Sequence, residues 1–486
     1  MKYVIVGGVA GGATAAARIR RNTEKAEIIL FEKGEYISYA NCGLPYYIGG
    51  VIRDRERLFV QTPEAFARRF RVDVRTASEV TAIDVRRKEV TVRTSDGREY
   101  VETYDKLLLS PGASPVRPPL TGIDSRGIFT LRNVQDTDRI KDYVRQHQVR
   151  RALIVGGGFI GLEMAENLQH TGAEVAVVEM AAQVMGPIDF SMAALVHEHL
   201  LQKGVKLYLE QAVESFEETT SGVTVKFKSG ITIETDLVIL SIGVRAETSL
   251  ASAAGLELGE MKGIRVNEYL QTSDESVYAV GDAIEFPHPL TGKPWLNFLA
   301  GPANRQARIV ADNMVFGNKV KYEGAVGTAI AKVFDQTVAS TGLPAKRLIQ
   351  FGIPYLSATI HSGSHAGYYP GALQMAIKIT FSPLGKQEKH LNHALLGWTY
   401  NSATKLWDFN NNYKLPDTNG ATTGGDRPGY EYVGGWKLRS SNQVLNENEK
   451  LEAKDNPSDF ATVSGEYKLA KPTISYLVDG KSKPVN

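Results

Sequence analysis

Residues 3–12 read YVIVGGVAGG, and residues 152–161 read ALIVGGGFIG. In each stretch an apolar strand runs into a glycine turn, and a helical pattern of small and apolar residues follows. A second apolar strand then ends in an acid, which is Glu32 in the first segment and Glu179 in the second. This repeated order predicts an α/β fold with two Rossmann-like, doubly wound dinucleotide-binding domains.

The two glycine turns predict dinucleotide binding. Their glycines allow a tight bend, the approach of a pyrophosphate and close packing of helix on strand, and the pyrophosphate meets free N–H groups at the helix N-terminus. The second turn matches GxGxxG in full, whereas the middle position of the first is Val9. The acid after each second strand can accept hydrogen bonds from ribose hydroxyls. Two such units predict two bound dinucleotides.

Further apolar strands end in residues 110–112 (SPG), in Gly243 and in residues 281–282 (GD). Parallel sheets of this type bind ligands beyond the carboxyl ends of their strands. We therefore expect Asp282 to face a ligand, although a turn capped by an aspartate would explain residues 281–282 equally well.

Composition and charge narrow the class of protein. The chain has 486 residues, 43% hydrophobic and 23% charged, which suits a globular protein of several domains of about 150 residues each. Its formal net charge is +2, so we expect neither a nucleic acid nor a membrane as partner. We find no apolar run of the ~18 residues that cross a bilayer and no signal-peptide pattern, so we expect a cytoplasmic protein. The single cysteine, Cys42, excludes an intrachain disulfide.

Over residues 1 to about 385, the sequence resembles the pyridine nucleotide–disulfide oxidoreductases, which are flavoproteins that bind two dinucleotides. The resemblance implies three domains and an atypical tail. These are a discontinuous FAD-binding domain (1–115 and 245–320), an NAD(P)H-binding domain (116–244), an α+β interface domain of a homodimer (321–385, or as far as about 450) and an atypical C-terminal region (386–486).

The resemblance also assigns cofactor contacts. For FAD these are Gly7, Val9, Ala10, Gly11, Gly12, Glu32, Lys33, Ser110, Pro111, Gly112, Asp282, Ala300 and Asn304. For the nicotinamide cofactor they are Gly156, Gly158, Phe159, Ile160, Gly161, Glu179 and Gly243. A carboxylate at Glu179 would repel a 2′-phosphate, and residues 180–183 (MAAQ) supply no cation to receive one. NADH is therefore favoured, with NADPH as the alternative.

The cysteine segment narrows the resemblance. Residues 38–50 read SYANCGLPYYIGG and resemble the signature of coenzyme A disulfide reductases and their single-cysteine relatives. The position five beyond Cys42 is Tyr47, so the CxxxxC pair of other members is absent. The resemblance places Cys42 at the start of a helix over the flavin, where the helix N-terminus would stabilise a thiolate. It implies that NADH, through FAD, reduces a mixed disulfide between Cys42 and coenzyme A.

Five polar residues are candidates for the substrate site, and two tyrosines for a catalytic role. Thr14, Arg18 and Arg21 lie where family members contact coenzyme A phosphates, although a solvated basic helix face explains the arginines equally well. The polar residues beside the sulfur are Ser38 and Asn41. Tyr368 and Tyr369 match a tyrosine that in relatives reaches the partner subunit's active site, and interface packing is their alternative role. We expect no metal site, because Gly and Pro surround His361 and His365.

Other functions stay open. An NADH oxidase or a polysulfide or persulfide reductase would use the same scaffold, and a flavin redox sensor would be reduced once by NADH and then stall. Peroxidases of this family carry a histidine in the first glycine turn, and this chain has none there.

The last hundred residues depart from the family. Residues 386–486 hold 11 asparagines and three of the four tryptophans, and they lack the tyrosine motif found near the C-terminus of relatives. Aromatic runs at residues 397–400 and 430–433 predict strands between turns. An accessory module, a divergent dimer domain and a wrongly recorded tail are the three interpretations.

Overall fold

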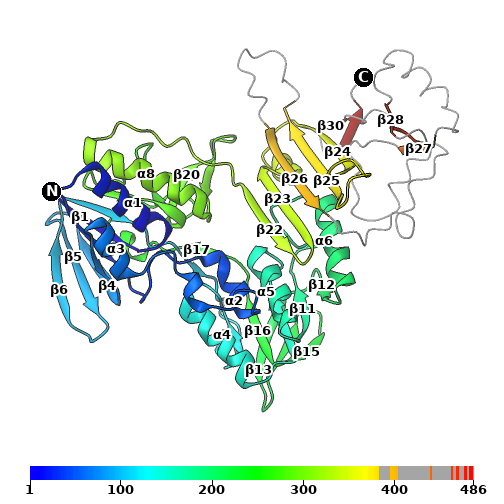
Figure 1. Ribbon diagram of the computed structural model, residues 1–486, viewed down its shortest axis with the longest axis horizontal. Coiled ribbons are helices and arrows are strands. Elements are labelled where there is room, and N and C mark those ends of the chain that lie inside the picture. Colours follow the sequence, from blue (N-terminus) through cyan, green and yellow to red (C-terminus); the bar gives the residue numbers. More distant parts are fainter. Residues whose placement is uncertain are drawn as a thin grey trace. The chain divides into compact units, whose positions relative to one another are not determined.

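A computed structural model describes residues 1–382 in full and, beyond them, the backbone of six strands. These strands are residues 395–402, 438–440, 461–463, 467–469, 475–478 and 481–484. The chain divides into two compact units. The first is Met1–Met180 with Glu210–Gly327, and the second is Ala181–Leu209 with Thr328–Asn486 (Figure 1).

The first unit contains a five-stranded sheet in which all neighbouring strands pair in parallel. Its strands, in order, are β19 (Val277–Ala279), β7 (Lys106–Leu109), β1 (Lys2–Val6), β2 (Glu27–Phe31) and β3 (Asp73–Arg75). Helices α1 (Ala10–Asn22) and α8 (Ala300–Phe316) pack side by side on it (Figure 1). The strand order reverses beside β1, and a switch point of this kind opens the crevice where such sheets bind ligands.

A second parallel sheet in the same unit places four strands side by side. They are β11 (Glu174–Val178), β10 (Arg151–Val155), β16 (Leu237–Leu240) and β9 (Ile128–Phe129). Helix α5 (Phe159–His170) follows β10, and α4 (Val134–Gln146) begins at a capping box formed by Asn133 and Asp136. The two parallel sheets confirm the predicted α/β fold. The exact boundaries of the separate domains stay predictions.

Short elements surround these sheets within the first unit. Its short helices are η1 (Asn41–Gly43), α2 (Leu44–Ile48), η2 (Arg55–Leu58), α3 (Pro63–Phe70), α7 (Ser249–Ala253) and η3 (Gly281–Ala283). Its other strands are β4 (Ser78–Asp84), β5 (Glu89–Thr94), β6 (Glu99–Thr103), β8 (Ala113–Pro115), β13 (Val213–Glu218), β14 (Val223–Phe227), β15 (Thr232–Thr235), β17 (Val244–Ala246), β18 (Ile264–Arg265), β20 (Ile284–Pro287) and β21 (Pro294–Leu296).

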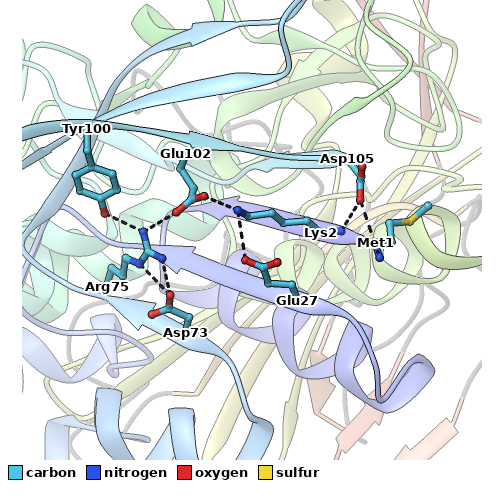
Figure 2. Close-up of polar contacts among 8 residues, drawn as sticks. All are labelled: Met1, Lys2, Glu27, Asp73, Arg75, Tyr100, Glu102 and Asp105. Atoms are coloured by element: carbon cyan, nitrogen blue, oxygen red, sulfur yellow. Dashed lines mark hydrogen bonds and ion pairs between the residues drawn. The ribbon is translucent and has the colours of Figure 1, made fainter.

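A network of ion pairs links strand β6 to the first parallel sheet, as Figure 2 shows. Glu102 of β6 accepts hydrogen bonds from Lys2 of β1 and, at 2.8 Å, from Arg75 of β3. Arg75 also donates to the Tyr100 hydroxyl at 3.0 Å and pairs with Asp73. Because these residues come from three strands, the network fixes the antiparallel strands β4–β6 against the parallel sheet.

The second unit is built on a seven-stranded sheet with antiparallel pairing. Its strands, in order, are β22 (Ala329–Val333), β23 (Gln336–Gly342), β26 (Leu395–Ser402), β25 (Gln374–Phe381), β24 (Leu356–Gly363), β30 (Ser475–Val478) and β31 (Lys481–Pro484). The unit also holds α6 (Phe190–Gln202), β12 (Lys206–Tyr208), α9 (Ala345–Gln350), β27 (Leu438–Ser440), β28 (Ala461–Val463) and β29 (Tyr467–Leu469).

The buried carboxylate of Asp189 joins three elements of the second unit. It lies just before α6, accepts the N–H groups of Ala345 and Lys346 at the start of α9 (3.1 and 3.2 Å), and pairs with buried Lys378 of β25 at 2.9 Å. The strand predicted around residues 397–400 is confirmed as part of β26, whereas the run at residues 430–433 lies outside the described residues. Within the described part of the chain, no helix combines the length and the apolar character needed to span a bilayer.

Candidate active site

The acid that ends each second strand is held by the glycine turn of its own unit. The Gly8 N–H donates to Glu32 Oε2 at 2.8 Å, and the Gly157 N–H donates to Glu179 Oε2 at 2.8 Å. Glu32 Oε1 also accepts the N–H of Gly34 at 2.8 Å. Each carboxylate is thereby fixed at the carboxyl edge of its sheet, and its remaining lone pairs can accept hydroxyl hydrogens.

Backbone geometry requires the first glycine of each turn. Gly7 has φ +100° and Gly156 has φ +104°, in the region that favours glycine. A Cβ on Gly7 would lie 2.1 Å from the Ser110 carbonyl oxygen, and one on Gly156 would lie 2.3 Å from that of Ser241. Each turn therefore runs directly against the end of a neighbouring strand.

Segments assigned to FAD converge around Ser110. A Cβ on Gly11 would lie 2.4 Å from Ser110 Oγ, and one on Gly281 would lie 3.7 Å from Ser110 Oγ and from Ala303 Cβ. The Gly281 N–H donates to Gln306 Oε1 of α8 at 2.7 Å. The first turn, the end of β7, the start of η3 and the first turns of α8 thus form one cradle of small residues and backbone. A cradle of this kind fits the pyrophosphate of a dinucleotide such as FAD.

Asp282 lies beside an arginine that the sequence did not single out. Arg132 Nη2 donates to Asp282 Oδ2 at 3.2 Å. Burial raises the pKa of Asp282, and the charge and hydrogen bond of Arg132 oppose that rise. The Arg132 N–H donates to Asp136 at the start of α4, which fixes its backbone. The only sequence signal for Arg132 is its place directly before the capping residue Asn133.

The candidate substrate residues on α1 meet different partners. The Thr14 hydroxyl donates to Asn304 Oδ1 of α8 at 2.6 Å, so packing of the two helices brings two predicted site residues together. Arg18 makes two hydrogen bonds to Asp312, at 2.8 and 3.0 Å, and Arg21 lies over the aromatic ring at the end of α3. Arg18 is thus already paired with a carboxylate of its own chain. The assignment of both arginines to coenzyme A phosphates stays a prediction.

The cysteine segment is hydrogen-bonded to the first glycine turn. The Ser38 N–H donates to the Gly8 carbonyl at 3.0 Å, and the Ser38 carbonyl accepts the Val60 N–H at 2.9 Å. Ser38 has φ +47°, which is uncommon for a residue with a Cβ. Asn41 and Cys42 follow in η1, where Cys42 is exposed. The Cys42 thiol therefore lies four residues after a direct hydrogen bond to the first glycine turn.

Helix α2, which follows Cys42, packs against α4 and α5. The contact with α5 is tight, since a Cβ on Gly49 would lie 2.4 Å from Asn167 Oδ1. The Tyr46 hydroxyl donates to Glu163 Oε1 of α5 at 3.2 Å. Burial raises the pKa of Glu163 to about 7, the hydrogen bond from Tyr46 opposes this, and the charge of Glu166 adds to it.

The pKa of the Cys42 thiol is raised above its ordinary value, first because the surrounding protein atoms partly exclude water from this exposed side chain and then by the charge of Glu163. The helix N-terminus predicted from the sequence would instead lower the pKa of this thiol. The physical reason for the difference is that α2 has only five residues, so its dipole is short, while a carboxylate stands nearby. Neither Tyr46 nor Glu163 was predicted from the sequence as a site residue, although Glu163 stands two residues after the last glycine of the second turn.

Tyr368 and Tyr369 lie in the second unit, on the loop between β24 and β25. They are 92% and 66% exposed. Their predicted part in catalysis stays a prediction. No group of three or more histidine, cysteine, aspartate or glutamate side chains in the described residues is arranged to hold a metal ion.

Comparison with known families gives a match between residues 1–301 and the pyridine nucleotide-disulphide oxidoreductases. The match spans more than half of the chain and includes both glycine turns and Cys42. The chain belongs to this family. It is an FAD-dependent oxidoreductase, as the resemblance implied, and the residues around Ser110 fit that cofactor.

Individual relatives of this flavoprotein share most of its length. The coenzyme A disulfide reductase of Staphylococcus haemolyticus is 36% identical over 381 residues, which are 78% of this chain and 84% of the relative. The crystal structure of reduced Bacillus anthracis CoADR-RHD superposes with a TM-score of 0.79, and its sequence is 50% identical to this one. The match covers 83% of this chain and 71% of that chain. The NAD-dependent persulfide reductase from A. fulgidus is 34% identical, with a TM-score of 0.78, over 82% of this chain and 73% of that chain.

Proposed function

We propose that this flavoprotein reduces coenzyme A disulfide with NADH through Cys42. The observation that carries the proposal is the position of the chain's single cysteine. Cys42 is exposed, and its segment is hydrogen-bonded to the first glycine turn. The helix that follows it packs on α5, which begins at the second glycine turn. The sulfur thus lies near elements that follow both glycine turns.

Different residues of the chain would bind the two cofactors. FAD, when bound, supplies two-electron transfer between a nicotinamide and a sulfur. The cradle around Ser110, together with Glu32 and Asp282, would hold FAD, and the second turn with Glu179 would hold the nicotinamide dinucleotide. A fixed carboxylate at Glu179 favours a ribose with a free 2′-hydroxyl, so we propose NADH as the donor.

A chain with one cysteine needs a second sulfur from the substrate. The Cys42 thiolate attacks the disulfide, forms a mixed disulfide with one coenzyme A and releases the other as a thiolate. Two electrons then break the mixed disulfide and return Cys42 and the second coenzyme A as thiolates, which take up protons. Each NADH therefore yields two coenzyme A thiols. We further propose a homodimer in which Tyr368 or Tyr369 serves the partner's site.

A second candidate is reduction of a coenzyme A-linked persulfide. The similarity to the A. fulgidus persulfide reductase favours it, and the same cysteine chemistry would serve.

Steady-state turnover tests the proposal. We expect the FAD-loaded protein to consume NADH continuously with coenzyme A disulfide and much more slowly with glutathione disulfide. Cys42→Ser should lower this rate by at least about 100-fold, because no other nucleophilic sulfur exists in the chain. Full turnover by Cys42→Ser would refute the cysteine mechanism. A single reduction by NADH that then stalls would indicate a redox sensor, and oxygen-dependent NADH consumption without disulfide would indicate an oxidase.

Mass spectrometry under non-reducing conditions identifies the sulfur partner. An adduct of coenzyme A mass on the Cys42 peptide would support the leading proposal, and one extra sulfur atom would support the persulfide reaction.

A further inference from the structure

A small hollow lies in the first unit beside the cradle that fits FAD. It is formed by the β20–β21 hairpin, the second turn of α8 and residues 322–325 after that helix. The residues that matter here are Gly281, Phe286, Trp295, Asn297, Gln306 and Tyr322. Counted for the centre of a water-sized sphere, its volume is about 10 Å³, which is room for about one water-sized group. Gly281 belongs to both the hollow and the cradle, so the two sites adjoin.

Two buried N–H donors in the hollow have no hydrogen-bond acceptor among the described residues. They are Nε1 of Trp295 and Nδ2 of Asn297. Trp295 lies in β21 and Asn297 follows two positions along, so both side chains reach the same side of the hairpin. A buried donor without an acceptor costs more free energy than an ordinary hydrogen bond contributes, and folded proteins rarely leave one. Both atoms therefore point to an acceptor that the protein binds.

A third donor reaches the hollow through hydrogen bonds that start in the cradle. The Gly281 N–H donates to Gln306 Oε1 at 2.7 Å, and Gln306 Nε2 donates to the Tyr322 hydroxyl oxygen at 3.0 Å. Burial raises the pKa of Tyr322, so the hydroxyl keeps its proton near neutral pH. Within the part of the chain that the structure describes, this O–H has no acceptor of its own. The hydroxyl can therefore donate into the hollow while it accepts from Gln306.

Aromatic packing holds two of these donors in place. Trp295 pairs with Phe286 across the hairpin, and its ring lies 5.0 Å from the His288 ring, at 78° to it. The Tyr322 ring packs on Phe286, with 4.9 Å between the ring centroids. Donors held by rigid neighbours lose little conformational freedom when an acceptor binds. The hollow is thus organised for an acceptor before that acceptor arrives.

The lining of the hollow selects a neutral acceptor. None of its lining residues is a lysine, arginine, aspartate or glutamate. An anion bound there would be buried without a cation, which is costly, and a metal ion would find no anionic ligand. A single uncharged oxygen atom accepts hydrogen bonds without either penalty.

We propose that the hollow binds one neutral oxygen atom, which accepts hydrogen bonds from Trp295, Asn297 and Tyr322. The oxygen comes from a pyrimidine carbonyl of FAD or from a water molecule. The shared residue Gly281 and the excess of donors favour FAD, because a carbonyl needs no acceptor of its own whereas water has two protons to donate. Donors on a flavin carbonyl would favour the electron-rich reduced ring. The inference does not depend on coenzyme A disulfide as substrate.

Binding of FAD analogues to the full-length apoprotein tests the inference without turnover. The probes are FAD, 2-thio-FAD and 4-thio-FAD, in which sulfur, a weaker acceptor, replaces one carbonyl oxygen. If a carbonyl occupies the hollow, the wild type should bind one of the two analogues about threefold to tenfold more weakly than FAD. Asn297→Leu removes the N–H at similar size. In this variant FAD should bind more weakly, and the difference between FAD and that analogue should shrink.

Two further variants sharpen the test. Trp295→Phe removes the second donor and should shrink the same difference, so it carries the test if Asn297→Leu does not fold. Lys293→Met is the control, because Lys293 is exposed in the turn of the same hairpin and should leave the wild-type ratio unchanged. A loss of packing alone would weaken FAD and its analogues equally and would leave the ratio as it is.

The remaining outcomes separate the two sources of the oxygen. If the ratio is the same in wild type and variants, FAD is not the source. A crystal structure of the FAD-loaded protein must then show a water oxygen within about 3.2 Å of Trp295 Nε1 and Asn297 Nδ2, which would support the water source. An unchanged ratio without such a water would overturn the inference. Since binding uses neither NADH nor a disulfide, these results are independent of the proposed function.

Discussion

Glu102 and Glu163 are both partly buried carboxyls of the first unit, yet their pKa values move in opposite directions. Burial opposes ionisation of Glu102, but hydrogen bonds and charges from Lys2 and Arg75 outweigh it and lower the pKa (Figure 2). Glu163 is also partly buried, but among the residues that the structure describes its hydrogen-bond donor is the Tyr46 phenol, and its charged neighbour is Glu166. The presence of a cation, rather than burial, decides which carboxyl stays ionised.

The difference follows the function of each region. The ion-pair network around Glu102 joins strands and has no part in the proposed chemistry. The region around Glu163 lies beside the segment of Cys42, the proposed reacting residue, and strongly shifted pKa values are often found at sites where protons must move. Substitutions in the two regions test whether they differ as the pKa directions indicate.

Removal of the central cation of the network should have the largest effect on stability. Arg75→Met keeps the aliphatic stem but leaves Glu102 and Asp73 without a guanidinium, so we expect about 3 kcal/mol of destabilisation at pH 7. Urea denaturation measures it. The matched control is Arg93→Met. Arg93 pairs with Glu99, and both side chains are more than half exposed, so loss of this pair should cost about 0.5 kcal/mol or less. Equal effects of the two variants would contradict the special role of the network.

Glu163→Gln should act in the opposite direction, and only at high pH. The folded-state pKa of about 7 exceeds the ordinary value of 4.5, so ionisation costs stability as the pH rises from about 4.5 to above 7. Glutamine avoids this cost and can still accept the Tyr46 hydrogen bond. We expect a gain of about 2 kcal/mol at pH 8 and almost none at pH 4.5, measured by urea denaturation.

The exposed residue Glu24 provides the control, because Glu24→Gln should change stability little at either pH. A loss of stability at pH 8 in Glu163→Gln would show that the carboxylate is compensated after all.

The smallest effect is expected at the outer end of the network. The Asp105 carboxylate accepts a hydrogen bond from the backbone N–H of Lys2 at 2.6 Å and lies 4.0 Å from the N-terminal amine of Met1. The Asp105 side chain is nevertheless 57% exposed. Asp105→Asn should therefore destabilise the protein by only about 0.5 kcal/mol at low salt. The difference from wild type should vanish in 1 M NaCl, because salt screens exposed charges. A loss as large as that of Arg75→Met would show that the network acts as one unit out to its exposed end.

Prediction from sequence succeeded where the determinants are local. The glycine turns, the acids Glu32 and Glu179 and the two parallel sheets follow from patterns within about thirty residues, since strand and helix periodicity and the φ of a glycine depend on near neighbours. The assignment of Cys42 to a redox role rests on a motif of similar length and stays a prediction. The comparisons with known proteins confirmed the family that these motifs indicated.

The pairs that tune the candidate site were not predictable in this way. Arg132 meets Asp282 across 150 positions, and Tyr46 meets Glu163 across 117. Arg18, expected to be available for a phosphate, is paired with Asp312, 294 positions away. No periodicity in the sequence records such contacts, because they depend on which faces of two distant elements pack together.

The sequence by itself determined the architecture and singled out Cys42 as the candidate redox sulfur, because strand order, glycine turns and a single cysteine are written in short stretches of residues. Only the tertiary structure decided the ionisation of the groups around that sulfur. A pKa depends on burial and on charges a few ångströms away, and the fold brings those neighbours from distant parts of the chain. That is why a helix start next to Cys42 indicated a stabilised thiolate, while the folded surroundings, with Glu163 nearby, favour the thiol.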